Sequence, residues 1–392
     1  MATTKNKEQD KIMEYRDMTH DEKRAWLALS HINISSNKLQ QFLERYSSIC
    51  ELFELSEKQL VQLGFRAGLK ERLDNVTDDI IEHDLSWFDS DNKHLIPFNS
   101  PDYPALLKEV ESAPKLLFVQ GNKELLNQYQ IAIVGSRNPT PQGKENAANF
   151  AKTLAQAGAV ITSGMALGVD GCAHQAALDQ GLPTVAVAGT GLDRVYPASH
   201  KDMAQDIVEH GALVSEFALG KGVRASHFPA RNRIIAGMSL GTLVVEAAIK
   251  SGSLITARLA MEQGREVFAI PGSIHNPLAR GCHALIKQGV KLVETAEEII
   301  EELQALALWQ AQSWQTSNNL GGGETQKRSS NEFELDDDYQ KLMQVIDYDT
   351  TSMDSIIDRS GLEIDVVSHM LLLLELNNHI VSVAGGYQRR SD

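Results

Sequence analysis

The sequence predicts an α/β protein whose central part is a Rossmann-like, doubly wound parallel sheet. Between residues 131 and 272, short apolar runs rich in Val, Ile and Ala alternate with helical stretches. Each run ends in a small or polar residue, which is typical of a parallel sheet that helices cover on both faces. Ligands of such a sheet bind at the carboxyl ends of the strands. The runs are IAIVGS (131–136), AVITSG (159–164), TVAVAG (184–189), ALVSEF (212–217), TLVVEA (242–247) and VFAIPG (267–272).

A small helical domain is expected to precede this core, over residues 1–95. Apolar residues recur at helical spacing over residues 22–85, and Gly64 and Gly68 interrupt the pattern. The spacing fits a module of the SAM or helix-hairpin-helix type. The first residues lack the apolar run of a signal peptide, and no stretch approaches the roughly 20 apolar residues that span a bilayer. We therefore expect a cytoplasmic protein that has no membrane segment.

The core is expected to span residues 96–305, and a flexible linker to follow over residues 306–333. The linker region contains QAQSWQTSNNLGGGETQKRSSN, in which polar residues and three consecutive glycines show no periodicity. Residues 334–392 then show three helical segments, followed by IVSV, two glycines and YQRR. This order of elements predicts a C-terminal winged-helix domain.

Charge is distributed unevenly along the chain, whose formal net charge is -15. Residues 221–293 contain ten Lys or Arg and three Glu, whereas residues 332–392 contain four basic and 13 acidic side chains. Because binding depends on the local field, the basic half of the core is the region that suits a polyanion. A winged helix that reads DNA presents a basic face. The acidic winged helix is therefore expected to contact protein or to act in regulation.

Neither a metal site nor a nucleotide cofactor is expected. The three cysteines, Cys50, Cys172 and Cys282, lie far apart, and no CxxC or paired Cys/His spacing occurs. A GTG sequence ending at Gly191 follows a strand, but the residue three positions later is Arg194. The G-x-G-x-x-G spacing of dinucleotide-binding loops is therefore absent.

Small residues follow the first strand of the core and turn the chain into a helix. They are Gly135 and Ser136, and Arg137 comes directly after them. Backbone N–H groups at a helix start attract phosphate, and the guanidinium of Arg137 offers a planar fork for it. The same glycine also suits a tight strand–helix turn that binds nothing. Both interpretations stay open from this motif alone.

The second strand ends in Ser163 and Gly164, where small residues again leave backbone groups accessible. The next helix carries Asp170 and His174. For these two we expect structural roles, because Asp170 suits a helix cap and His174 suits the apolar face of the helix.

Two further motifs carry groups that suit a nucleic acid. Phe228 precedes Arg231, Asn232 and Arg233. Arginine holds phosphate through paired hydrogen bonds, and an aromatic face stacks on a base. The alternative places Phe228 in the core and pairs the arginines with acids. After another strand, the Ser-Gly-Ser sequence at residues 251–253 opens a helix whose cap and free N–H groups also suit a phosphate.

Five motifs follow one another along the chain, at residues 131–137, 163–174, 189–201, 227–239 and 246–257, and together they resemble those of the DNA-processing protein A (DprA/Smf) family. The match runs almost continuously over residues 101–293, and the strings HFPARNRIIAG and SGSLITA are highly specific. The resemblance implies a protein that binds single-stranded DNA, forms a homodimer and helps to load RecA recombinase during natural transformation. It implies no catalytic residues.

The resemblance also implies the site residues. Arg137 is expected to contact a DNA phosphate, and Phe228 to lie against a base. The DNA-binding residues that we predict are Gly135, Ser136, Arg137, Ser163, Gly164, Lys201, Arg224, Phe228, Arg231, Asn232, Arg233, Ser251, Gly252 and Ser253. The predicted dimer contacts are His283, Ile286 and Leu292, and Met261 and Lys287 are expected near RecA.

This chain departs from some relatives at two positions where they carry lysine. Ala198 follows Tyr-Pro here, and the nearest lysine is Lys201. Ala225 lies two residues before the histidine of HFP, with Arg224 beside it. Whether Lys201 and Arg224 take over the roles of those lysines is an open question.

Two other classes of function stay open. One is a nucleotide-hydrolysing enzyme on a similar Rossmann-like core, with Glu246 as its best candidate acid. Only Asp170 and Asp193 offer a second carboxylate, and each also suits a structural role. The other class is a regulator that acts through the winged helix.

Overall fold

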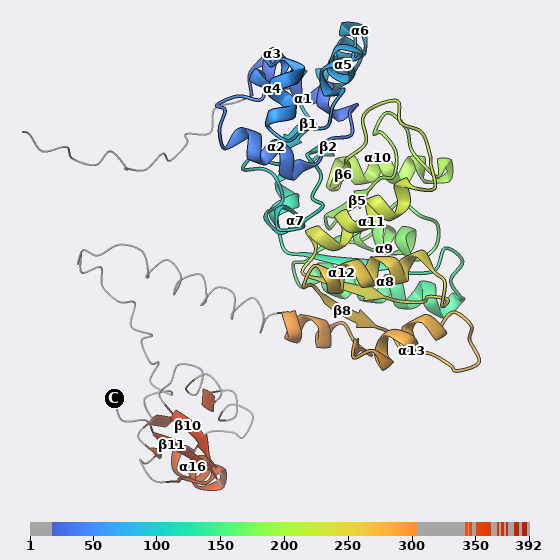
Figure 1. The fold of residues 1–392 in the computed structure, drawn as a ribbon. Coiled ribbons are helices and arrows are strands. Elements are labelled where there is room, and N and C mark those ends of the chain that lie inside the picture. Colours follow the sequence, from blue (N-terminus) through green and yellow to red (C-terminus); the bar gives the residue numbers. More distant parts are fainter. Residues whose placement is uncertain are drawn as a thin grey trace, which may run out of the picture. The chain divides into compact units, whose positions relative to one another are not determined.

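The computed structural model describes residues 18–303 and a set of shorter stretches nearer the C-terminus (Figure 1). The shorter stretches are 342–343, 345–346, 350–361, 367, 370–371, 374, 380–383 and 386–389. All the described residues together fall into two compact units, one within Met1–Gln315 and the other within Thr316–Asp392. Each unit is described by itself. The linker predicted over residues 306–333 lies outside the described residues.

Short helices that share an apolar core form the first part of the first unit. They are α1 (His20–Ser30), α2 (Ser36–Leu43), α3 (Glu51–Glu54), α4 (Glu57–Gln62), α5 (Leu69–Asp74), α6 (Asp78–Ser86) and the 3-10 helix η1 (Trp87–Asp89). Helix α1 begins at a capping box, in which Thr19 and Glu22 each accept a hydrogen bond from the other's backbone N–H. Trp26 meets Phe98 edge to face, with ring centroids 5.8 Å apart. The apolar core of the helices thereby continues into that of the sheet.

Within residues 18–303, nine strands form one sheet. Their order is β1 (Lys93–Pro97), β2 (Leu116–Gly121), β6 (Ala212–Ser215), β5 (Thr184–Val187), β4 (Val160–Gly164), β3 (Gln130–Val134), β7 (Gly241–Val244), β8 (Glu266–Ala269) and β9 (Lys291–Leu292). From β6 to β9 in this order the strands run parallel, and β1 and β2 add an antiparallel edge. The parallel part confirms the predicted Rossmann-like fold.

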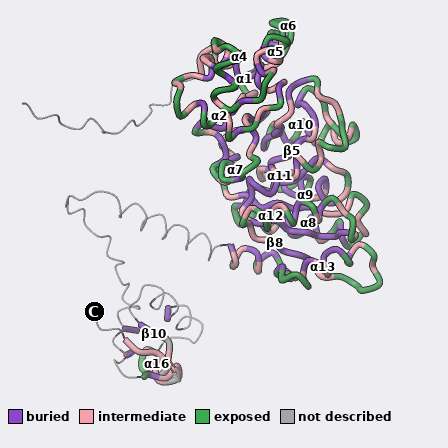
Figure 2. The backbone as a smooth tube through the Cα atoms, in the orientation of Figure 1, coloured by how far each residue is buried: buried purple, intermediate pink, exposed green. Residues whose placement is uncertain are grey.

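Helices cover both faces of this sheet, because alternate residues of a strand are apolar on both sides. Ile131 and Ile133 of β3 pack with the helices of one face, and Ala132 and Val134 pack with those of the other. All four are buried, as are the central strands in Figure 2. The helices are α7 (Ala105–Lys108), η2 (Lys123–Asn127), α8 (Pro141–Gln156), α9 (Val169–Leu178), η3 (Ala198–His200), α10 (Lys201–His210), α11 (His227–Met238), α12 (Gly252–Glu262) and α13 (Arg280–Lys287).

Local sequence explains where the helices that flank β3 and β7 begin. Helix α8 starts after Thr140, whose hydroxyl accepts the Gly143 N–H at 3.0 Å, and Pro141 takes the first helical position. Helix α11 is not predicted from the apolar pattern; its Pro229 lies in the first turn, where a missing N–H breaks no bond. Across the part of the chain that the structure describes, no helix is long and apolar enough to cross a membrane.

The order of the strands reverses between β3 and β7. From β3 the chain proceeds through β4 and β5 to β6 on one side, and from β7 through β8 to β9 on the other. Connections that leave two adjacent parallel strands in opposite directions open a crevice at the carboxyl ends of those strands. The fold therefore predicts a binding site where β3 and β7 end.

The second unit contains helix α16 (Met353–Ser360) and an antiparallel hairpin of β10 (Ile380–Val383) and β11 (Gly386–Arg389). The hydroxyl of Ser352 caps α16, and Gly361 ends it in a left-handed conformation. Ile356 and Ile380 belong to a small apolar cluster of this unit. The hairpin lies where the sequence predicts the wing, whereas much of the first and third predicted helices lies outside the described residues.

His174 on α9 has the structural role that the sequence predicts. Its ring is fully buried, with Nδ1 2.7 Å from the Thr184 hydroxyl and Nε2 2.9 Å from the carbonyl oxygen of Gly164. Burial lowers the pKa of His174 from 6.5 to about 4. The neutral imidazole thus ties α9 to the ends of two strands.

This shift predicts an acid-sensitive contribution to stability. Between pH 6.5 and about 4, the unfolded chain takes up a proton at His174 that the folded chain excludes. The free energy of unfolding should therefore fall as the pH drops through this window, by on the order of 3 kcal/mol from this residue. In His174→Gln, where the amide replaces the Nε2 donor without titrating, urea unfolding at pH 7 and pH 4.5 should show a smaller loss. An equal loss in both proteins would contradict the assignment.

Candidate nucleic-acid interface

A pocket of about 290 Å³ lies at the carboxyl ends of β3 and β7, where the fold predicts a site. It brings together side chains from motifs that are far apart in the sequence. The predicted site residues that line it are Gly135, Ser136, Arg137, Phe228, Arg231, Asn232, Ser251, Gly252 and Ser253. Asp170 and the first turn of α12 complete its wall.

The loop after β3 is held by close packing against the start of α9. A Cβ atom on Gly135 would lie 2.6 Å from the Val169 side chain, so only glycine fits there. The hydroxyl of Ser136 accepts the Asn138 N–H at 3.1 Å. Arg137 is exposed, and its guanidinium carbon lies 5.2 Å above the centre of the Phe228 ring. Among the described residues, no carboxylate lies within ion-pair distance of Arg137, so it faces the pocket free of a salt bridge.

Helix α11 supplies Phe228, Arg231 and Asn232 at positions i, i+3 and i+4, which share one face of a helix. The side chain of Arg231 is 6% exposed, and its Nη1 lies 3.7 Å from a carboxylate oxygen of Asp170. Its Nε and Nη1 atoms have no hydrogen-bond partner. Buried cations are costly unless they are paired and hydrogen-bonded. The pocket therefore contains a cation whose bonding an anion would complete.

Gly164 makes room for this guanidinium. A Cβ atom at Gly164 would lie 1.2 Å from Nη1 of Arg231, so any larger residue would displace the arginine. Desolvation lowers the pKa of Arg231 and raises that of Asp170, while each charge partly offsets the shift of the other. Gly164 thus affects the site without lining it, because its lack of a side chain leaves the space that the Arg231 guanidinium occupies.

The start of α12 forms the opposite wall. Ser251 caps this helix, and its hydroxyl accepts the Ser253 N–H at 3.1 Å. Asn232 donates to the carbonyl oxygen of Gly252 at 3.3 Å, which joins α11 to this turn. The Ser253 N–H is therefore already bonded, and what this end of α12 presents to the pocket is the partial positive charge of the helix dipole.

Five predicted residues do not line the pocket, and Gly164, which lies behind Arg231, is one of them. Ser163 is fully buried, and its hydroxyl donates to the carbonyl oxygen of Ile133 at 2.5 Å. Arg233 forms an ion pair with Glu216. For this arginine the alternative interpretation of the motif, in which the arginines pair with acids, is the one that the structure shows. Lys201 and Arg224 are exposed, at the start of α10 and in the loop before α11.

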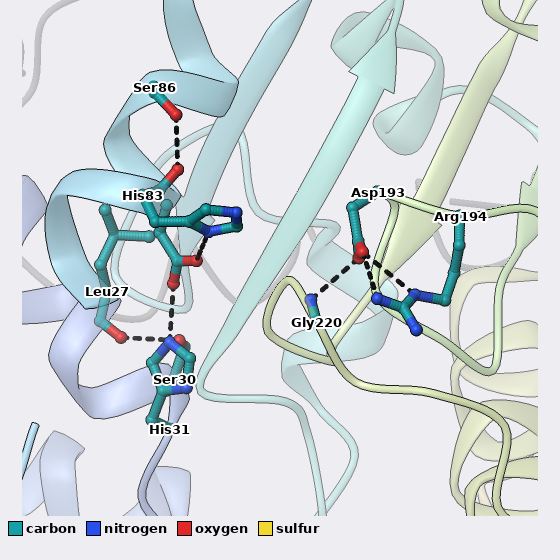
Figure 3. Close-up of polar contacts among 9 residues, drawn as sticks. Leu27, Ser30, His31, His83, Ser86, Asp193, Arg194 and Gly220 are labelled. Atoms are coloured by element: carbon teal, nitrogen blue, oxygen red, sulfur yellow. Dashed lines mark hydrogen bonds and ion pairs between the residues drawn. The ribbon is translucent and has the colours of Figure 1, made fainter. Parts of the chain in front are cut away.

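The carboxylates considered for hydrolysis have structural partners. Glu246 accepts the backbone N–H of Thr140 at 2.9 Å and its hydroxyl at 2.7 Å, and also the side-chain amide of Asn276 at 3.1 Å. Asp193 accepts the Gly220 N–H at 3.0 Å and two bonds from Arg194 (Figure 3). Asp170 faces Arg231. Each of the three carboxylates therefore either accepts hydrogen bonds that hold loops together or lies beside a buried arginine.

The predicted contact residues lie at the β9 edge of the sheet and on α12. Leu292 on β9 is 42% exposed, and Met261 at the end of α12 is 39% exposed. Ile286 and His283 on α13 are half-buried, and Lys287 is exposed. Figure 1 shows α13 at the end of the unit opposite to α1–α6.

Tyr196 is a residue of this region that the predicted site omits. It lines a second pocket of about 70 Å³, which shares Arg137, Phe228 and Arg231 with the first. Tyr196 and Pro197 follow the GTG sequence that ends at Gly191, but nothing in the spacing shows that their loop approaches α11.

Comparisons with known proteins match both units. The family model described as DNA recombination-mediator protein A matches residues 94–304, and the model described as DprA winged helix domain matches residues 326–386. Protein Smf of Escherichia coli (strain K12) is 43% identical over 310 residues, which cover 79% of this chain and 80% of that protein. DNA processing protein DprA of Streptococcus pneumoniae is 46% identical over 202 residues, which cover 52% of this chain and 71% of that protein.

A solved structure gives the same result. The X-ray structure of DNA processing protein A from Streptococcus pneumoniae superposes with a TM-score of 0.65 at 37% identity, and covers 71% of this chain and 97% of that one. The resemblance that the motifs carry and the predicted winged-helix domain are thereby confirmed. This chain belongs to the DNA recombination-mediator protein A (DprA/Smf) family.

Proposed function

We propose that this protein binds single-stranded DNA, with a backbone phosphate in the pocket between β3 and β7. The observation that carries the proposal is Arg231, a buried and incompletely bonded cation that faces an open pocket beside the start of α12. Membership of a family described as recombination mediators supports a nucleic acid as the ligand.

The pocket's charges and surfaces suit one nucleotide of a strand. Arg137 and Arg231 bring two guanidiniums against the single carboxylate of Asp170, which leaves a local excess of positive charge. Phe228 lies at the rim beside Arg137, where a base attached to the bound phosphate would meet its face. Groups that read base edges are few in this pocket, so binding should depend little on sequence.

The protein acts by binding rather than by catalysis in this proposal. A hydrolase needs a carboxylate or another base that is free to take a proton from water. Glu246 already accepts three hydrogen bonds from Thr140 and Asn276, and Asp170 faces Arg231. These contacts support structural roles for the acids on which the hydrolase alternative depends.

The proposal includes a cytoplasmic homodimer that helps to load RecA recombinase during natural transformation. The family description and the names of the relatives support a role in DNA processing and recombination. Leu292 and Met261 are exposed apolar side chains of the kind found in the buried core of protein interfaces. The acidic C-terminal unit, with 13 acidic and four basic side chains over residues 332–392, suits a protein partner better than DNA.

Single strands should bind more tightly than a blunt duplex of the same length. The exposed base faces of a single strand can reach Phe228, whereas those of a duplex are stacked inside it. Affinity should fall steeply as salt rises, because bound phosphates release counterions. Fluorescence anisotropy across a salt series measures both effects. Equal or tighter binding of the duplex would refute the proposal.

Arg137→Ala should weaken single-strand binding about tenfold to a hundredfold. A charged hydrogen bond is worth on the order of 1.5–3 kcal/mol, and each 1.4 kcal/mol is about tenfold in affinity. The melting temperature should change little, because the side chain is exposed. Arg137→Lys should recover part of the loss, since lysine keeps the charge without the planar fork. Wild-type affinity in Arg137→Ala would place the phosphate elsewhere.

Ile286→Arg should give folded monomers if α13 and β9 form the dimer surface. An arginine buried without a partner in a two-fold contact is strongly unfavourable. Because Ile286 also packs partly against the core, Leu292→Arg at an exposed position serves as a second variant. Analytical ultracentrifugation gives the oligomeric state, and circular dichroism checks the fold. Dimers in both variants would move the contact to another surface.

A further inference from the structure

A second, smaller pocket adjoins the phosphate pocket. It has a volume of about 70 Å³, and the two pockets share Arg137, Ala166, Phe228 and Arg231. The lining of the larger pocket contributes serines, an amide, guanidiniums and a helix start. The residues that only the smaller pocket has are mostly apolar or aromatic: Met165, Leu167, Gly189, Tyr196 and Pro197. The larger pocket therefore offers the hydrogen-bond donors that a phosphate needs, and the smaller pocket adds an aromatic wall beside them.

Tyr196 is the unusual member of this lining. It is 46% exposed, and Leu167 beside the same pocket is 47% exposed. The Tyr196 ring centroid lies 6.1 Å from that of Phe228, and the two ring planes are inclined by 46°. Rings at this separation contact each other directly, so the two side chains form one continuous aromatic surface. A base that stacks on the exposed part of the Tyr196 ring would extend this aromatic pair, which is a favourable arrangement for aromatic groups.

The separation of the two rings is set by hydrogen bonds between the loops that carry them. Tyr196 lies in the loop after β5, and the loop after β6 leads into α11 and Phe228. Ser215 donates to the carbonyl oxygen of Thr190 at 2.6 Å, and the Gly191 N–H donates to that of Lys221 at 3.0 Å.

The same two loops are joined at two more points. Asp193 accepts the Gly220 N–H at 3.0 Å while Arg194 holds the same carboxylate, as Figure 3 shows. His227, next to Phe228, contacts the carbonyl oxygen of Gly189 at 3.1 Å and stacks on Phe217. Two loops joined in this way keep their aromatic side chains at a constant distance before any ligand binds.

We infer that Tyr196 is a DNA-contacting residue, which together with Phe228 holds one base while the adjoining pocket holds its phosphate. This inference rests on the proposed function and adds the second aromatic wall. The pocket is too small to enclose a whole base, so the base stands at the mouth, against the exposed face of Tyr196. Stacking of this kind accepts any base, because every base presents a flat aromatic face.

The test separates the base from the phosphate. The full chain is titrated with an oligothymidylate and with an abasic strand of equal length, and the ratio of the two affinities is the readout. Tyr196→Ala should lower this ratio about 5- to 100-fold, which is the loss expected from removing one stacking aromatic. Tyr196→Phe should keep the ratio, because it keeps the ring. Tyr196→Leu, which keeps apolar bulk without an aromatic face, should behave like Tyr196→Ala.

Controls distinguish the possible failures. Val61→Ala, an exposed apolar position in the N-terminal helices, should leave the ratio unchanged. If Tyr196 only supported the loop, its variants would lose affinity for both strands equally, and the inference would be wrong. A wild-type ratio in both Tyr196→Ala and Tyr196→Leu would also overturn it. If the wild-type chain bound neither strand, the proposed function itself would fail, which is a different outcome.

Discussion

The carboxylate of Glu246 links the segment after β7 to the segment after β3, at the point where the strand order of the sheet reverses. Glu246 follows β7, and it holds Thr140, the residue that caps α8 after β3. Space for it exists because Gly143 has no side chain; a Cβ there would lie 2.5 Å from the carboxylate. The loop that carries Arg137 is therefore short, and it is fixed at one end by β3 and at the other by Thr140, which Glu246 holds. A binding loop held at both ends loses little conformational freedom when a ligand arrives.

Much of this arrangement can be predicted from the sequence, and particular residues show why. The parallel strands are predicted because each is an apolar run buried on both faces. Strand β1 is missed because KHLIP mixes charged and apolar residues, and β2, LLFVQG, because it precedes the alternation of strands and helices over residues 131–272. Helix α11 is missed because its apolar residues do not recur at helical spacing along one face. Within the site, Arg137 and the residues at 251–253 are predicted because they follow strand ends, where ligands of such a sheet bind.

Other site residues depend on packing that spacing does not encode. Arg231 and Arg233 are two positions apart and chemically identical, yet one faces the pocket and the other pairs with Glu216. Ser163 lies within the buried strand β4 and donates to the neighbouring β3, whereas Ser136 lies in the half-buried loop after β3. Tyr196 comes near Phe228 because two loops are joined by hydrogen bonds between residues more than 25 positions apart. Such contacts exist only once the sheet has formed.

The two arginines of α11 together explain how a buried charge can serve as a binding group. Residues two positions apart lie about 200° apart around a helix, so Arg231 and Arg233 lie on nearly opposite sides. On the side away from the pocket, Arg233 and Glu216 form an ion pair that links α11 to the loop after β6. On the pocket side, Asp170 neutralises Arg231 only in part, at 3.7 Å, and leaves Nε and Nη1 of the guanidinium without a hydrogen-bond partner. An anion that enters the pocket therefore meets a guanidinium that is already desolvated and held in position. The free-energy cost of removing Arg231 from water is a cost of folding, so binding does not incur it again.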